Sequence, residues 1–174
     1  MNPSHPNFAE FDPLAYIPVT GRRWRGPTLN IPERLRAQLV SELIAGKQAM
    51  NQHSPGSDGH TRALHRVLDA RRALGEHDDR FDQASGANDA SAHAVSAIRA
   101  LLRSRPRGDM ITAHEVESIV AAGGWQRCGE VVSAAVGQLL AAEELVEITA
   151  HPGEVRAGRH ASTERRFGRG PGFC

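Results

Sequence analysis

Residues 131–146 read VVSAAVGQLLAAEELV, and this stretch decides the fold that we expect for the C-terminal half of the chain. Its apolar side chains recur at helical spacing: Val132, Val136, Leu139 and Leu140. That spacing predicts a helix over about residues 129–144 with one buried face. Residues 145–149 then alternate between apolar and polar side chains, as a half-buried strand does. The sequence therefore predicts a helix that passes directly into a strand.

Two further helices are expected before this stretch. One begins near Ser91, and its apolar face carries Val95, Ile98, Leu101 and Leu102. The next begins after Thr112, because Glu115 stands three residues further on, at the spacing of a capping box. Short extended segments are expected at 109–111, before this second helix, and at 162–167, after a turn-rich loop.

The resulting order of elements resembles the winged-helix (winged helix-turn-helix) superfamily of bacterial and phage DNA-binding proteins. Members often carry a small residue in the third helix and a Leu-Val pair that leads into a strand, as Ser133 and Leu145-Val146 are placed here. The resemblance covers residues 91–168 and rests on the pattern of elements. It implies a mainly α fold with a small antiparallel β wing, which is an α+β class.

A winged helix implies that the third helix enters the major groove of double-stranded DNA and that the wing contacts phosphates. Gln pairs with adenine, Ser bonds to either base type, and Arg bonds to guanine or to phosphate. The resemblance therefore implies these DNA-binding residues: Gln126, Arg127, Ser133 and Gln138 around the third helix, and Arg156, Arg159, Arg165 and Arg166 along the wing. The outward-facing small residues Ala134 and Gly137 would let the helix approach the groove closely.

The charge pattern divides the chain into regions. Residues 126–145 carry one Arg and three Glu, a formal charge of −2, whereas a helix that reads DNA usually carries more cations. Basic stretches lie elsewhere: residues 150–174 carry +3, residues 18–36 carry +4, and residues 99–107 hold four Arg and no acid. These stretches either converge on one polyanion or are solvated faces. The whole chain carries only +1, which excludes a strongly basic, histone-like protein.

Residues 1–30 hold five of the ten prolines and are expected to form an extended arm. The arm contains a short basic motif with one aromatic residue: Arg22, Arg23, Trp24 and Arg25. Two interpretations remain open. The motif lies in a minor groove or stacks on a base, or Trp24 folds back onto the helices that follow.

Residues 31–75 are expected to form a pair of helices. Their apolar stripes are Leu35, Leu39, Leu43 and Ile44 on the first helix, and Leu64, Val67, Leu68 and Leu74 on the second. Such a pair buries too little apolar surface to be stable alone. It must pack on the C-terminal domain, or on its copy in a homodimer formed through residues 32–75.

A solvated linker is expected between the two helical parts. Residues 76–90 carry five acids and one Arg, a formal charge of −4, and include Ser-Gly-Ala-Asn at 85–88. This composition is typical of a flexible segment, so we place a domain boundary there. Residues 169–174 are expected to form a C-terminal tail.

The motifs that would indicate an enzyme are missing from the sequence. It contains no phosphate-binding glycine loop, nucleophile elbow or zinc-binding set, so no catalytic residue, metal ligand or cofactor is expected. Its two cysteines, Cys128 and Cys174, lie far apart and do not indicate a disulfide framework. No signal peptide or membrane-spanning run is found, so we expect a cytoplasmic protein that binds a partner rather than catalyses a reaction.

Two functions follow from this pattern. The first is DNA binding, as a transcriptional regulator or a replication or partition factor of a bacterium, phage or plasmid. The alternative is a winged-helix adaptor or inhibitor that binds another protein, for example in a phage or host-defence setting. The basic wing and arm favour DNA, whereas the acidic third helix favours a protein partner.

Overall fold

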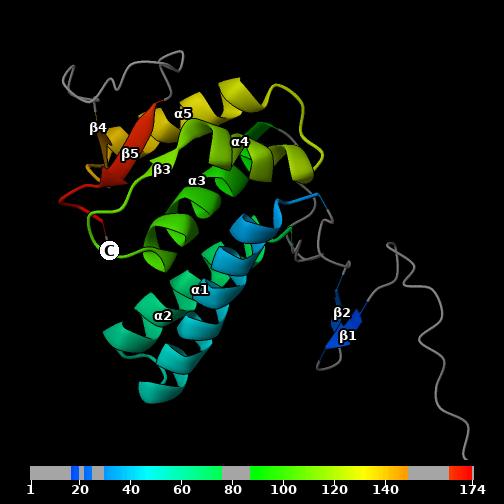
Figure 1. The fold of residues 1–174 in the computed structure, drawn as a ribbon. Helices are drawn as coiled ribbons and strands as arrows, with labels where there is room; N and C mark the ends of the chain where they lie inside the picture. Colours follow the sequence, from blue (N-terminus) through cyan, green and yellow to red (C-terminus); the bar gives the residue numbers. More distant parts are fainter. Residues whose placement is uncertain (1–16, 20–21, 25–29, 76–86, 149–164, 174) are drawn as a thin grey trace, which may run out of the picture.

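The computed structural model describes residues 17–19, 22–24, 30–75, 87–148 and 165–173 (Figure 1). Within these ranges it is mainly helical, with a small three-stranded antiparallel sheet. The elements are β1 (Ile17–Val19), β2 (Arg22–Trp24), α1 (Glu33–Gln52), α2 (Asp58–Ala73), α3 (Ala87–Ser104), β3 (Ile111–Thr112), α4 (Ala113–Ala122), α5 (Cys128–Ala141), β4 (Leu145–Ile148) and β5 (Arg166–Arg169). Among the described residues, strands β1 and β2 form a separate two-stranded antiparallel sheet.

Helix α3 lies in the middle of the molecule, with α1 and α2 on one side and α4 and α5 on the other (Figure 1). Its buried positions are mostly small or branched: Ala90, Ala94, Ala97, Ile98, Ala100, Leu101 and Leu102. Small side chains allow neighbouring helices to approach closely. As a result, one continuous apolar cluster extends from Ile31 to Phe167.

Helix α3 begins four residues before the expected start at Ser91, so part of the expected linker is helical. Ala90 is buried and holds the first turn against the core. Asp89 stands in that turn, where a carboxylate is favoured by the positive end of the helix. The rest of the expected linker, residues 76–86, lies outside the described residues.

Helices α1 and α2 pack on each other and on α3, which is one of the two arrangements that the sequence left open. The expected stripe of α2 is partly wrong. Its buried face is Ala63, Val67, Ala70 and Ala73, whereas Leu68 is 50% exposed. Ile44, on α1, is 51% exposed. The alanine face of α2 is the buried one because its small side chains let α1 approach closely. At this contact, a Cβ added at Gly46 of α1 would stand 2.9 Å from the Cγ2 of Val67 on α2.

The sheet has the strand order β3-β5-β4. The expected strand at 145–149 is confirmed as β4. The extended piece expected at 109–111 overlaps β3 only at Ile111, because β3 starts two residues later and ends one residue later. The returning strand was expected at 162–167 but lies at Arg166–Arg169. Phe167 sets its position, because its ring is buried in the core and its backbone faces Ile111.

The capping box predicted at the start of α4 is confirmed. The Thr112 hydroxyl accepts a hydrogen bond from the Glu115 amide at 3.2 Å, and the Glu115 carboxylate accepts one from the Thr112 amide at 3.0 Å. The same carboxylate receives two hydrogen bonds from the buried Arg105, at 2.7 and 3.1 Å. Arg105 also donates to the Met110 carbonyl and to the Gln38 side chain. This network joins α1, α3 and α4.

We expect Glu115→Gln to make the protein less stable at neutral pH, by about 2 kcal/mol. The amide keeps an oxygen for the Thr112 N–H but leaves the buried Arg105 without a carboxylate. Burial alone would raise the pKa of Glu115, but the hydrogen bonds from Arg105 and the Thr112 amide outweigh it and lower the pKa. A lowered pKa means that the carboxylate stabilises the fold above its unfolded pKa of about 4.3, and this stabilisation is lost as pH falls through the folded value.

Urea unfolding at pH 7, 5 and 3 measures this effect. The difference in unfolding free energy between wild type and Glu115→Gln should be largest at pH 7 and shrink towards pH 3. Glu117→Gln, on the same helix, is the control and should track the wild type. An equal difference at all three pH values would contradict the role given to the Glu115 charge.

Candidate nucleic-acid interface

Helix α5 follows a tight turn that fixes where it starts. Arg127 precedes its first residue with a φ of 55°, a left-handed backbone conformation. The Cys128 thiol donates to the Trp125 carbonyl at 3.1 Å, and the Trp125 ring packs against the buried His93 with ring centres 4.4 Å apart. The turn is compact, since a Cβ on Gly123 would meet the Trp125 ring at 2.2 Å. Trp125 thus anchors the start of α5 to α3.

One face of α5 is buried and the opposite face is open. The buried residues are Val132, Ala135, Val136 and Leu139. The four residues predicted to bind DNA around this helix are exposed, as are both small residues predicted to face outward: Gln126, Arg127, Ser133 and Gln138, with Ala134 and Gly137. Glu130 is exposed as well. At Gly137 a Cβ would have nothing within 4 Å. The outward face therefore bears short side chains, and a partner can approach the helix backbone.

The helix is less acidic at its surface than its composition suggests. Glu144 accepts two hydrogen bonds from Arg99, at 2.7 and 2.6 Å, and this ion pair raises the pKa of Arg99. Arg127 and Glu130 face each other at 3.6 Å with both side chains more than 70% exposed, so their attraction is screened by water. With Glu144 neutralised by Arg99, the −2 charge of residues 126–145 becomes −1.

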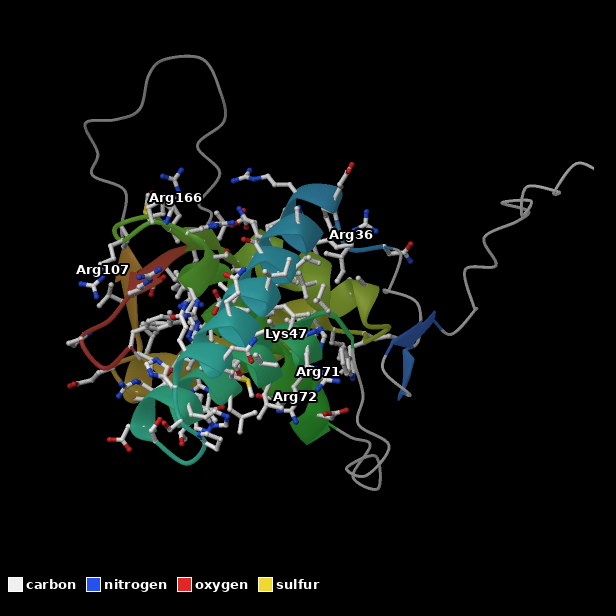
Figure 2. The ribbon with its side chains drawn as sticks, turned by 90° about the horizontal axis from the view of Figure 1, so that it is seen from below. Arg36, Lys47, Arg71, Arg72, Arg107 and Arg166 are labelled. Carbon is white, nitrogen blue, oxygen red and sulfur yellow. The ribbon has the colours of Figure 1, made fainter. Side chains whose placement is uncertain are left out.

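The basic stretch at 99–107 is largely structural, because three of its four arginines form ion pairs within the fold. Arg99 pairs with Glu144, Arg103 with Asp69 at 2.7 Å, and Arg105 with Glu115 at 2.7 Å. Each pair joins two different elements of the fold. Arg107 is exposed, and Figure 2 shows it pointing away from the body at the same end as Arg166.

The wing residues predicted from the sequence fall into two groups. Arg156 and Arg159 lie outside the described residues. Arg165 and Arg166 are exposed at the start of β5. Arg165 donates two hydrogen bonds to Glu147 on β4, which lowers the pKa of Glu147. The charge of Arg165 is therefore partly offset by Glu147, so of these two arginines the exposed Arg166 is better placed to bind a phosphate.

For the arm motif, the structure describes the backbone of residues 22–24 but not their side chains. Arg22, Arg23 and Trp24 form β2, in which Trp24 faces Ile17 and Arg23 faces Pro18. Arg25 lies outside the described residues. Both interpretations of Trp24, contact with a nucleic acid and packing on the helices, stay predictions.

The structure also contains a cleft that the sequence did not predict, beside the sheet and away from the outward face of α5. Its walls come from the ends of α1 and α2 that meet at residues 49–66, from 103–109, and from β4, β5 and the residues after β5. The expected tail, 169–174, contributes to it: the Gly170 and Gly172 amides donate to the carbonyls of Glu144 and Glu143 at 2.8 and 2.9 Å. A Cβ on Gly170 would stand 2.1 Å from the Glu143 carbonyl oxygen, so glycine is required there. In the sequence, this pair of glycines was the signal that could have indicated the close packing of the tail.

Among the described residues, no group of three or more His, Cys, Asp or Glu side chains is placed to hold a metal ion. The helices in these ranges include none that is long and apolar enough to cross a bilayer. Comparison with models of known protein families, with curated proteins and with solved structures finds no match for this chain.

Proposed function

We propose that α3 to β5 form a winged helix that binds double-stranded DNA, with α5 in the major groove. The observation that carries this proposal is the outward face of α5. It is exposed, bears short polar or small side chains, and leads within four residues into β4 of a three-stranded antiparallel sheet. A major groove about 12 Å wide admits an α-helix, and short side chains let the backbone approach base edges.

The order of elements supports the fold assignment. Three helices, α3, α4 and α5, are combined with strands in the order that the resemblance to winged helices implies. The last strand, β5, pairs with both β3 and β4 and lies between them, as the returning strand of a wing would. The protein would then serve as a transcriptional regulator or a replication or partition factor.

In this proposal the residues around α5 read bases and the wing holds phosphates. Ser133 and Gln138 are exposed on successive turns of α5, where their side chains can bond to base edges. Gln126 and Arg127 stand at the N-terminal end of the helix, which favours phosphate. Arg166 on β5 adds a second phosphate contact, together with Arg156 and Arg159.

A winged-helix adaptor that binds another protein is the second candidate. The described part of the outward α5 face has one cation, Arg127, and it faces Glu130. Ala134, Gly137 and Ala141 make much of this face small and exposed, which suits close packing of a partner helix as well as a groove.

We expect two sets of substitutions to affect DNA binding differently. Replacing Arg159, Arg165 and Arg166 by Ser should weaken binding to all sequences, and the salt slope should fall by about 1 for each phosphate that is no longer bound. Replacing Ser133 and Gln138 by Ala should instead relax sequence preference, by roughly 1–3 kcal/mol for each good base interaction that is removed, with little change in salt slope.

Fluorescence anisotropy with selected and random duplexes at several salt concentrations measures both effects. Arg72→Ser, an exposed arginine on α2, is the control and should leave both affinity and slope unchanged. If both sets alter the affinity equally for all sequences, α5 does not read bases. If neither set changes a weak residual affinity, the adaptor is the better proposal.

A further inference from the structure

A cleft of about 820 Å³ lies between the α1–α2 hairpin and the outer side of the sheet. This volume is within the range of about 300–1,000 Å³ that small-molecule sites occupy. The cleft draws its walls from three separate parts of the chain, so it exists only in the folded protein. It does not include the outward face of α5.

The first wall is cationic and largely pre-organised. Five arginines line the cleft: Arg62, Arg66, Arg103, Arg107 and Arg169. Arg66 is fixed by Glu42 through bonds of 2.7 and 2.9 Å, and Arg103 by Asp69 at 2.7 Å. Held in this way, these guanidinium groups lose little freedom when an anion binds.

The positive charge of the cleft is not cancelled by its acids. Arg169 donates to the carbonyls of Leu102 and Arg105, which orient its guanidinium without neutralising it. Asp109 is the one acid on the lining, and Glu42 and Asp69 offset Arg66 and Arg103. Five arginines against these three carboxylates leave a formal charge of +2.

The second wall is apolar. Val146 and Ile148, which follow the buried Leu145 on β4, line the cleft at the outer side of the sheet. Beside them is Gly168, where a Cβ would come within 3.0 Å of the Ile148 side chain. The Phe173 ring completes this wall, with the guanidinium carbons of Arg103 and Arg169 at 5.6 and 5.5 Å from its centre.

We propose that this cleft binds a small amphipathic anion, with a carboxylate, sulfonate or phosphate group and an aromatic or branched aliphatic body. The arginines hold the anionic group, with the exposed Arg62 and Arg107 able to close on it from the solvent side. Val146, Ile148 and Phe173 cover the apolar body. A nucleic-acid backbone would contact the arginines but leave the apolar wall uncovered, whereas a small amphipathic anion contacts both walls.

The probe for this site is 8-anilinonaphthalene-1-sulfonate, whose fluorescence rises in apolar surroundings. We expect saturable binding to one site on the full chain. N-phenyl-1-naphthylamine, which lacks the sulfonate, should bind at least about tenfold more weakly, because it cannot form a charge-assisted bond. Arg62→Glu and Arg107→Glu should each weaken sulfonate binding by about tenfold or more. Arg72→Glu, which lies outside the cleft, should have no effect.

A second variant reports on the apolar wall. Ile148→Ser, at a position 37% exposed, should weaken both probes while leaving the thermal melt close to that of the wild type. Non-saturable binding, equal affinity for the two probes, or insensitivity to Arg62 and Arg107 would overturn the proposal. So would displacement of the probe by duplex DNA, which would assign the cleft to a nucleic-acid surface. The probe assay does not depend on whether the protein binds DNA.

Discussion

Leu39→Glu is expected to unfold the protein, whereas Leu68→Glu is expected to leave it folded. Both leucines lie on the α1–α2 pair and both were predicted to be buried. Leu39 is 0% exposed within the apolar cluster and Leu68 is 50% exposed. A carboxylate at Leu39 would remove the leucine packing and bury an unpaired charge, at a combined cost of about 5 kcal/mol or more. That cost is comparable with the whole stability of a typical domain, about 5–15 kcal/mol.

Circular dichroism with urea titration compares the two variants under identical conditions. Leu68→Glu should stay within about 0.5 kcal/mol of the wild type, as exposed substitutions do. Leu39→Ala is a milder companion and should lower the unfolding free energy by about 2–5 kcal/mol while the protein remains folded. Equal effects of glutamate at the two positions would show that the packing of α2 on α1 and α3 is described wrongly.

Gly137→Glu is expected to abolish DNA binding without loss of stability. A side chain at Gly137 meets nothing within 4 Å, and glutamate is a better helix former than glycine. A carboxylate at the centre of the proposed groove face would oppose the phosphates and weaken binding by about 100-fold or more.

Gly137→Arg separates the two candidate functions. With DNA as the partner, arginine should retain much more affinity than glutamate, because its charge attracts phosphate. With a protein partner that packs on the small residues, both bulky side chains should remove binding, while Gly137→Ala keeps it. Anisotropy and thermal melting of the three variants measure affinity and fold together. Full DNA affinity in Gly137→Glu would exclude α5 from the interface.

Local signals in the sequence predicted the helices of the C-terminal half well. The Thr112–Glu115 capping box marks the start of α4, and the spacing of Val132, Val136 and Leu139 gives the buried face of α5. These signals act over a few residues and depend little on the rest of the chain. The exposed residues of α5 could therefore be named in advance from the buried ones.

The sequence was misleading where distant parts of the chain meet. Leu68 was predicted to belong to the core, but the close fit of the alanine face of α2 turns it outward. For the arginines at 99–105 the sequence left open a polyanion-binding surface or a solvated face, but each of them pairs with a carboxylate from another part of the fold. The cleft was not predicted, because its walls come from segments that are far apart in the chain.

The measurement that tests the central claim most directly is the binding of the wild-type protein to a labelled random duplex as salt is raised. At about 50 mM salt we expect a dissociation constant no weaker than about 10⁻⁴ M, as for non-specific DNA binding. Between about 50 and 200 mM salt, log affinity should fall with a slope of about −2 to −4, which corresponds to two to four phosphate contacts. No change in anisotropy at about 50 mM salt with protein above about 10⁻⁴ M would contradict DNA binding.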